Sequence, residues 1–196
     1  SSIAIAGITW ALIGYSLAFD GTGDLIGGLN YVGLHDVTFE PRDGTTIPHL
    51  VFFAFQATFC IITVALISGA VVERMRFGTF MVFAALWSVL VYAVLAHWGF
   101  GGGWLFEGGT LDFAGGTVVH ISSGLSALAA ALVIGKRRGF GHEPMPPHSL
   151  PLTVTGAALL WFGWFGFNAG SALSAGALAT SAFTVTNTAA ASAALS

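Results

Sequence analysis

Charged residues are scarce in this 196-residue sequence, where only 8% of positions are Asp, Glu, Lys or Arg. Soluble domains carry about 25% charged residues, so a water-soluble globular domain is excluded. With six Lys and Arg and a net charge of −3, the chain cannot form the basic patch of a nucleic-acid-binding protein. A hydrophobic content of 55% also excludes an intrinsically disordered chain.

Cysteine is scarcer still, because Cys60 is the only one in the sequence. A single cysteine excludes an internal disulfide framework and a cysteine-rich metal site. No nucleophile–base pair and no metal-ligand spacing can be found at a common membrane depth. We therefore predict that the protein is not an enzyme and holds no metal and no cofactor.

The sequence contains several long stretches without any charged residue. A helix needs about 20 apolar residues to cross a bilayer, and the last stretch, from Pro144 to Ser196, is long enough for two. We predict an all-α membrane protein with one transmembrane domain over residues 1–196. The chain begins and ends inside apolar segments, which suggests a piece of a longer protein. The predicted spans are residues 2–19, 49–72, 78–98, 115–135, 149–168 and 176–196.

The few basic residues predict the orientation of these spans. Most of them lie in two loops, 73–77 and 136–148, and Arg42 alone falls on the opposite side. By the positive-inside rule the two basic loops are cytoplasmic. Among the outer connections, we expect residues 20–48 to form an ordinary surface loop. Residues 99–114 are too apolar and glycine-rich for that, so we expect them to pack onto the bundle and line a vestibule.

Two ionisable residues fall within or beside the fourth span. An unsatisfied imidazole in hydrocarbon costs about 2–7 kcal/mol, so His120 must either bond to a neighbouring helix or face a polar cavity. Ionisable groups at this depth are functional candidates. Asp112 stands at the start of the span, where it either caps the helix and interacts with its dipole or attracts cations from outside.

Aromatic residues are concentrated on two of the spans. Phe55 and Phe59 are four residues apart and share one helix face on the second span. The fifth span has a similar group between Trp161 and Phe167. Such residues usually face lipid or pack in a core. Two opposed Phe faces with a hydroxyl would instead form a cation-binding mouth above an apolar constriction.

Six sequence blocks resemble those of the ammonium transporter, methylammonium permease and Rhesus-glycoprotein superfamily, and most closely its bacterial and plant ammonium transporter branch. Because they occur in the family's order along the whole chain, an accidental match is excluded. The blocks are GYSLAF ending at Phe19, AFQATF ending at Phe59, GGGWL ending at Leu105, DFAGGTVVH ending at His120, GKRRGFG ending at Gly141 and GWFGFNAGSAL ending at Leu173.

The resemblance implies a multi-span helical bundle of the ammonium transporter type. Family members have eleven transmembrane helices, ten of which form two inverted five-helix repeats, and they assemble as homotrimers with one pore per subunit. This chain resembles helices two to seven, and so an incomplete inverted repeat. The implied location is the plasma or inner membrane, as a multi-pass protein.

The resemblance also implies an outer site that recruits ammonium. In this sequence the matching positions are the aromatic wall of Phe55 and Phe59, the hydroxyl of Ser171 and the buried acid Asp112. Phe100 stands where the family commonly has Trp before the triple glycine. Because Phe offers a weaker cation–π face than Trp and no indole N–H, we expect a weaker outer site.

Below that site the resemblance implies a gate and a pore. Phe59 and Phe167 match the two stacked rings of the gate, and His120 matches the first of two pore histidines. The implied mechanism is deprotonation of ammonium near the gate and passage of neutral ammonia through an apolar, histidine-lined lumen. The second histidine belongs to a later helix, beyond Ser196.

The alternative function is an ammonium sensor, in which the same fold carries a cytoplasmic signalling domain. The implied partners are ammonium or ammonia, with methylammonium as an analogue, the lipid bilayer and the other subunits of a homotrimer. A PII-type regulatory protein is a further candidate partner for the cytoplasmic stretch from Lys136 to His148, which could equally be a solvated basic loop. No nucleic-acid partner is expected.

Overall fold

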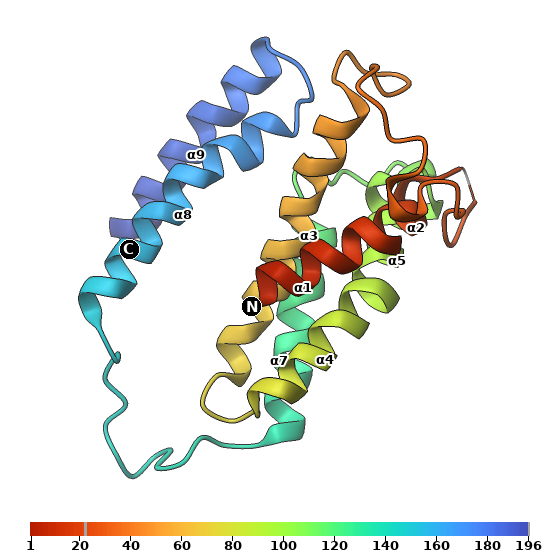
Figure 1. Ribbon diagram of the computed structural model, residues 1–196. Helices are drawn as coiled ribbons and strands as arrows, with labels where there is room; N and C mark the ends of the chain where they lie inside the picture. The colour runs from red at the N-terminus through yellow and green to blue at the C-terminus, as the bar shows by residue number, and fades with distance from the viewer. Residues whose placement is uncertain (22, 196) are drawn as a thin grey trace. The chain divides into compact units, whose positions relative to one another are not determined.

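The computed structural model describes residues 1–21 and 23–195 (Figure 1). These residues are all-α, since they form helices and no named strand, and the predicted fold class is confirmed. They divide into two compact units, each described by itself below. The first comprises Ser1–Arg42 and Pro48–Arg137, and the second comprises Asp43–Ile47 and Arg138–Ser196.

The first unit contains the first four predicted spans. Several are made of shorter helical pieces that follow one another without a break. Two further short helices, η2 (Val32–Leu34) and α6 (Trp104–Glu107), lie in the connections. The four spans are α1 (Ser2–Thr9), η1 (Trp10–Gly14) and α2 (Tyr15–Phe19); α3 (His49–Val71); α4 (Phe77–Trp87), η3 (Ser88–Tyr92) and α5 (Ala93–Phe100); and η4 (Gly116–Ile121) and α7 (Ser122–Ile134).

Three of these pieces, η1, η3 and η4, are π-helical turns inside the spans. Such turns are rare and are often found at functional sites. The first two meet each other, because the hydroxyl oxygens of Thr9 and Ser88 lie 2.7 Å apart. The rings of Trp10 and Tyr92 pack edge to face beside them, with centroids 5.7 Å apart. The first and third spans are therefore joined where both are locally widened.

Helix α3 is the central element of the first unit and packs against both α1 and α7 (Figure 1). Its buried side includes Phe52, Phe59, Val64 and Ile67. Around it, α1 packs against α4 and α2 against α5. The indole N–H of Trp87 also donates to the hydroxyl of Ser126, at 3.1 Å, which links α4 to α7. A single apolar core therefore holds the four spans together.

At one end of this unit an arginine joins two helix ends. The guanidinium of Arg74 donates to the carbonyl oxygens of Ala70, near the end of α3, and of Gly135, just after α7. Beside it, Arg137 and Glu73 form an ion pair. Carbonyls at helix C-termini lack intrahelical donors, and a cation favours this end of the helix dipole. The two basic loops thus meet at one end, as alternating spans require.

At the other end, the described residues of the 20–48 connection lie mostly on the surface, as expected, and part of the loop is hydrogen-bonded to the bundle. The side chain of Asp20 is only 6% exposed, and its carboxylate accepts hydrogen bonds from the main-chain and side-chain N–H groups of Asn30. The hydroxyl of Ser16 donates to Gly28 O and accepts from the N–H of Tyr31. Buried polar groups of the first span therefore hold this part of the loop against the bundle.

The far end of the same loop is fixed against α3. The Nε2 atom of His49 and the hydroxyl of Tyr15 are hydrogen-bonded at 2.7 Å, and the Tyr31 ring packs edge-on against His49. Arg42, the base expected on this side, lies 4.4 Å from the centroid of the Phe52 ring. A cation over an aromatic face is attracted by the ring quadrupole.

The second unit contains two helices, α8 (Leu150–Gly170) and α9 (Ala177–Leu195), which lie side by side (Figure 1). The rings of Phe165 and Phe183 stack between them with centroids 4.3 Å apart. The side chain of Asn168 also joins the two helices, since it donates to the hydroxyl of Thr186 on α9. It accepts a hydrogen bond from Trp164 on its own helix. The two helices form a hairpin with a polar as well as an aromatic link.

Among the residues that the structure describes, five helical segments are long and apolar enough to cross a membrane, and the chain is a multi-pass integral membrane protein. These segments begin and end within two residues of the first five predicted spans, except that the third ends nine residues later than predicted. The sixth predicted span forms α9, which is not among the five, and its crossing of the membrane stays a prediction. The five are Ser2–Phe19, His49–Val71, Phe77–Glu107, Gly116–Ile134 and Leu150–Gly170.

Candidate functional site

Three of the predicted recruitment residues lie together in the first unit. The ring of Phe59 packs edge to face against Phe55, with centroids 4.9 Å apart, and against Phe100, with centroids 6.2 Å apart. Phe59 is buried, whereas Phe55 and Phe100 are half-buried. The cluster therefore has a packed centre and two rings that still expose part of their surface, as a cation-binding wall requires.

Close backbone contacts on either side hold Phe100 in place. A Cβ atom on Gly99 would lie 2.5 Å from a methyl carbon of Val118, and one on Gly101 would lie 1.8 Å from the carbonyl oxygen of Ala18. Neither space could hold a side chain. Helix α5 thus approaches η4 on one side of Phe100 and the end of α2 on the other.

Residues 99–114 pack onto the bundle only in part. The N–H of Trp104 donates to the carbonyl of Asp24, at 3.1 Å, so the triple glycine folds back onto the outer loop as expected. Further along, Leu111 is 99% exposed and Phe106 and Phe113 are also exposed. Packing of this later part onto the bundle, and its lining of a vestibule, stay predictions.

The two tryptophans near Phe100 contact each other and the loop. Their rings, from Trp98 and Trp104, pack edge to face with centroids 5.5 Å apart. The indole N–H of Trp98 donates to the carbonyl of Leu25, at 2.8 Å. This donor is therefore engaged in holding the loop and does not replace the indole that Phe100 lacks.

Asp112 caps the helix that begins with η4. One carboxylate oxygen accepts from the N–H groups of Gly115 and Gly116, at 2.7 and 2.6 Å, and the other accepts from Thr117 and Val118, both at 2.9 Å. A carboxylate at a helix N-terminus is stabilised by these donors and by the helix dipole. The capping explanation of this acid therefore has a direct geometric basis. Its attraction for cations stays a prediction.

His120 follows within the same π-helical turn. Its N–H donates to the carbonyl of Gly115, five residues earlier, at 2.9 Å, and the N–H of Val119 shares this acceptor. Val118 and Val119 are buried, whereas the side chain of His120 is exposed on the surface of this unit. His120 is therefore not a core histidine of the first unit.

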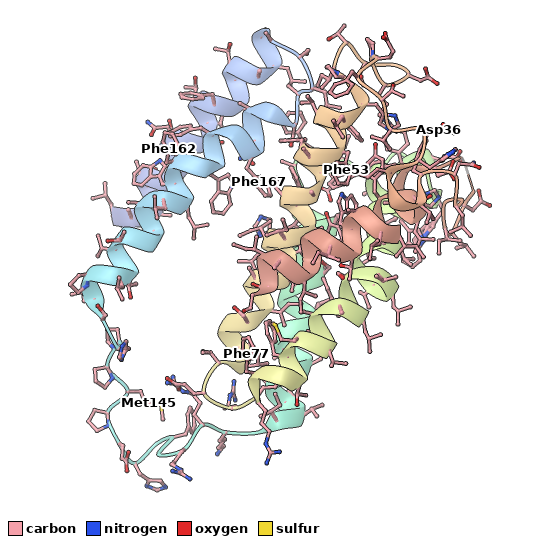
Figure 2. The ribbon with its side chains drawn as sticks, in the orientation of Figure 1. Asp36, Phe53, Phe77, Met145, Phe162 and Phe167 are labelled. Atoms are coloured by element: carbon pink, nitrogen blue, oxygen red, sulfur yellow. The ribbon has the colours of Figure 1, made fainter. Side chains whose placement is uncertain are left out.

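Phe167 and Ser171 lie one turn apart at the end of α8. The hydroxyl of Ser171 donates to the carbonyl of Phe167, at 2.8 Å, and both side chains are half-buried. Phe167 and the exposed Phe162 project from different sides of α8 (Figure 2). The hydroxyl oxygen of Ser171 keeps its lone pairs, with which it could accept a hydrogen bond from a cation.

The predicted site residues thus fall into two groups. The first unit brings together the three phenylalanines and, across the contact of Gly99 with Val118, the segment that holds Asp112 and His120. The second unit holds Phe167 and Ser171. Pairing of Phe59 with Phe167 as a gate stays a prediction. Among residues 1–21 and 23–195 no group of three or more His, Cys, Asp or Glu side chains could bind a metal ion.

One residue beside the site was missed from the sequence. His97 lies one turn before Phe100, is fully buried, and contacts two main-chain carbonyl groups through its ring. The sequence did carry a signal, because His97, like His120, is an ionisable residue within an apolar span.

Comparison with known proteins gives a consistent result. The model of the Ammonium Transporter Family matches residues 1–196. An ammonium transporter of Bacillus subtilis (strain 168) is 55% identical over 192 residues, which are 97% of this chain and 47% of that protein. The crystal structure of Candida albicans Mep2 aligns with a TM-score of 0.82 and 40% identity, over 89% of this chain and 40% of the Mep2 chain.

A solved structure named Sensor Amt Protein has the same fold. It aligns with a TM-score of 0.79 and 31% identity, over 89% of this chain and 45% of its own. The chain therefore spans about half the length of the relatives that it matches. The Bacillus relative is named a transporter and not an enzyme.

Proposed function

The chain belongs to the ammonium transporter family, and from this we propose that the full-length protein transports ammonium or ammonia across the plasma or inner membrane. The observation that carries the proposal is the position of His120. An ionisable side chain stands exposed on an apolar span, in a helix capped by Asp112 and next to the aromatic cluster. Such a residue in a membrane marks a polar pathway.

Recruitment of ammonium at the outer aromatic cluster is the first step. A bare cation pays a large desolvation energy on entering hydrocarbon, and aromatic faces offset part of it. Phe55 and Phe100 offer partly exposed faces, and Ser171 supplies a hydroxyl acceptor. The charge of Asp112 adds a favourable field, although its oxygen atoms are engaged by four N–H groups. These residues take the substrate-recruitment role.

Deprotonation and passage follow. Phe59 and Phe167 form the gate, behind which the lumen is apolar. Ammonium loses its proton near the gate and crosses as neutral ammonia, while His120 and a partner histidine beyond this chain supply polar contacts and a route for the proton. Potassium cannot use this route because it has no proton to release and donates no hydrogen bonds.

Replacement of His120 tests this function in the full-length protein. We expect His120→Ala to change the ammonium-evoked current of reconstituted vesicles and their selectivity against potassium, because the lumen loses its polar contact. His142→Ala is the matched control, since His142 is exposed in a loop outside the spans, and it should behave as the parent. An unchanged current and selectivity in His120→Ala would refute the role of this residue. A parent protein with neither an ammonium current nor methylammonium uptake would refute the proposed function.

The outer site gives a second test through Phe100. We expect Phe100→Trp to strengthen cation binding, because Trp offers the better cation–π face. The whole of an exposed cation–π contact contributes about 0.5–1 kcal/mol and Phe already supplies part of it, so the KM for methylammonium should fall by less than about fivefold, with an unchanged maximal rate. Radiolabelled methylammonium uptake measures both values. Phe106→Trp is the control, since Phe106 lies in the exposed part of the same connection, and a similar fall in that variant would argue against a specific site.

The proposed assembly follows the family. The full-length protein forms a homotrimer with one pore in each subunit, and a PII-type protein contacts the cytoplasmic stretch from Lys136 to His148. Five of the six basic residues of the chain fall in or beside the two cytoplasmic loops, which gives an acidic surface on a regulator a complementary site.

The alternative function is an ammonium sensor. Its support is the structural similarity to the Sensor Amt Protein, which covers 89% of this chain. A signalling domain after the last helix of the full-length protein, together with ammonium binding without current, would favour the sensor. Ammonium-evoked current would favour the transporter.

A further inference from the structure

Asp20 is a buried carboxylate directly after the first span. It follows α2 and is only 6% exposed. One carboxylate oxygen accepts from the main-chain N–H of Asn30, at 2.6 Å, and the other accepts from the side-chain NH2 group of Asn30, at 3.1 Å. Hydrogen bonds to an ionised acceptor are shorter and stronger than those between neutral groups. Asp20 and Asn30 thus close this stretch of the outer loop.

Close main-chain contacts leave the Asp20 carboxylate little room. A Cβ atom on Gly28 would lie 2.5 Å from a carboxylate oxygen, and one on Gly27 would lie 2.7 Å from the main-chain oxygen of Asp20. The N–H of Gly28 donates to that same main-chain oxygen, at 2.7 Å. The hydroxyl of Ser16 donates to Gly28 O and accepts from the N–H of Tyr31, both at 3.0 Å. The end of the first span therefore holds the closed loop in one arrangement.

The closed loop in turn holds the segment that carries Phe100. The main-chain oxygen of Asp24 accepts from the N–H of Trp104, at 3.1 Å. The main-chain oxygen of Leu25 accepts from the indole N–H of Trp98, at 2.8 Å. Trp98 and Trp104 stand on either side of Phe100 in the sequence. The loop therefore fixes this turn at two points, and Phe100 lies between them.

The position of Phe100 matters because its ring forms one wall of the outer aromatic cluster. The ring is half-buried and packs edge to face against Phe59, with centroids 6.2 Å apart. A binding group that is misplaced by about 1 Å can lose most of its effect. The hydrogen bonds that the Asp20 carboxylate accepts come from Asn30, so it acts on the cluster through the loop and not by direct contact.

We propose that Asp20 is a positioning residue for the outer cation site, and that its contact with Asn30 sets the position of Phe100 through the outer loop. The proposal rests on the proposed function for the role of Phe100 in binding, but the effect of the contact on the turn does not. When the loop is no longer closed at Asp20, the turn is released and the outer site binds the cation less tightly.

The first test removes the acceptor in the full-length protein. We expect Asp20→Ala to raise the KM for methylammonium about fivefold with an unchanged maximal rate, because the loop loses both bonds that close it. Asp36→Asn is the matched control, since Asp36 is exposed on the same loop and Asn tolerates its φ of +57°. The control removes the same outer charge and should keep the parent KM. A parent KM in Asp20→Ala, or a similar rise in Asp36→Asn, would overturn the proposal.

The second test exchanges the two side chains. Asn30→Asp sets two carboxylates against each other where donor and acceptor now lie 3.1 Å apart, so at about pH 8 the KM should rise at least as far as in Asp20→Ala. In the double variant Asp20→Asn/Asn30→Asp, the new amide accepts from the same main-chain N–H and donates to the new carboxylate, so both bonds return at the parent net charge. We expect its KM to lie within about twofold of the parent. A double variant that keeps the raised KM of Asn30→Asp would refute the role of this contact.

A structural readout separates the positioning role from the function on which it rests. Cryo-electron microscopy of full-length Asp20→Ala should show the ring centroids of Phe59 and Phe100 further apart than 6.2 Å, and an unmoved pair would overturn the proposal. If the parent transports nothing, the proposed function fails, and this comparison still decides the positioning role. If Asp20→Ala does not fold, the ring positions in Asn30→Asp and in the double variant decide it in the same way.

Discussion

Replacement of Asp112 by Ala in the full-length protein should abolish transport and lower the thermal stability sharply. The carboxylate accepts from four successive N–H groups, those of residues 115–118, at the start of the helix that carries His120. Hydrogen bonds to a charged group contribute about 1.5–3 kcal/mol each, so the loss should exceed about 5 kcal/mol. For a protein about twice the length of this chain, this corresponds to a fall in Tm of at least about 6 °C in detergent.

Two further variants identify the cause of that loss. Asp112→Asn keeps one acceptor oxygen but turns an NH2 group toward the other two N–H groups, so it should fall between the parent and Asp112→Ala. Asp24→Ala removes an exposed carboxylate from the outer loop and should change the free energy of unfolding by less than about 0.5 kcal/mol. If Asp112→Ala melts with the parent, the cap does not stabilise the fold.

Gly101→Ala should be almost as damaging, for a steric reason. The added Cβ would lie 1.8 Å from the carbonyl oxygen of Ala18 and 3.0 Å from the Cα of His97, and both are main-chain atoms that cannot rotate away. The turn must therefore open, which moves Phe100 away from Phe59. We expect the KM for methylammonium to rise more than about tenfold, with a Tm at least about 5 °C lower.

Gly102→Ala is the matched control within the same turn. Gly102 has a φ of +90°, and a Cβ there would meet nothing within 4 Å. The substitution therefore adds backbone strain of about 1–3 kcal/mol without a clash. It should lower the Tm moderately and leave the KM near that of the parent. Equal KM values in Gly101→Ala and Gly102→Ala would show that the contact with Ala18 does not position the site.

The spans were predictable because each is a long run without charge, and a helix is the one structure that satisfies its own backbone in lipid. The positions of Phe55 and Phe59 on one face follow from helix geometry in the same way. The edge-to-face contact of Phe59 with Phe100 does not, because it depends on how α3 and α5 cross. Local sequence patterns carry little information about such contacts between distant segments.

The hydrogen bonds that anchor the outer loop, and the π-helical turns, were not predictable for a related reason. The charge of Asp20 predicts an exposed residue. Asp20 is nevertheless buried, because Asn30, ten residues later, supplies two hydrogen-bond donors to its carboxylate. The widened turn at Ser88 meets a hydroxyl 79 residues away, at Thr9. The hydrogen bonds that compensate for these local irregularities come from other elements. The sequence around Asp20 or Ser88 alone therefore does not predict them.

The joint made by Arg74 has a consequence for the order of events during synthesis. The guanidinium belongs to the loop after the second span, while one of its acceptors, Gly135 O, follows 61 residues later. Once residue 74 has left the ribosome, its positive charge stays on the cytoplasmic side of the membrane by the positive-inside rule. The carbonyl of Ala70 is already beside it.

The emerging fourth span therefore meets a donor that is already in place. Once residue 135 has left the ribosome, the end of α7 can dock on Arg74 while later residues are still being added. We expect this joint to form during translation and to hold α3 against α7 before the later spans insert. The charge that orients the second span thus also marks where the fourth will end.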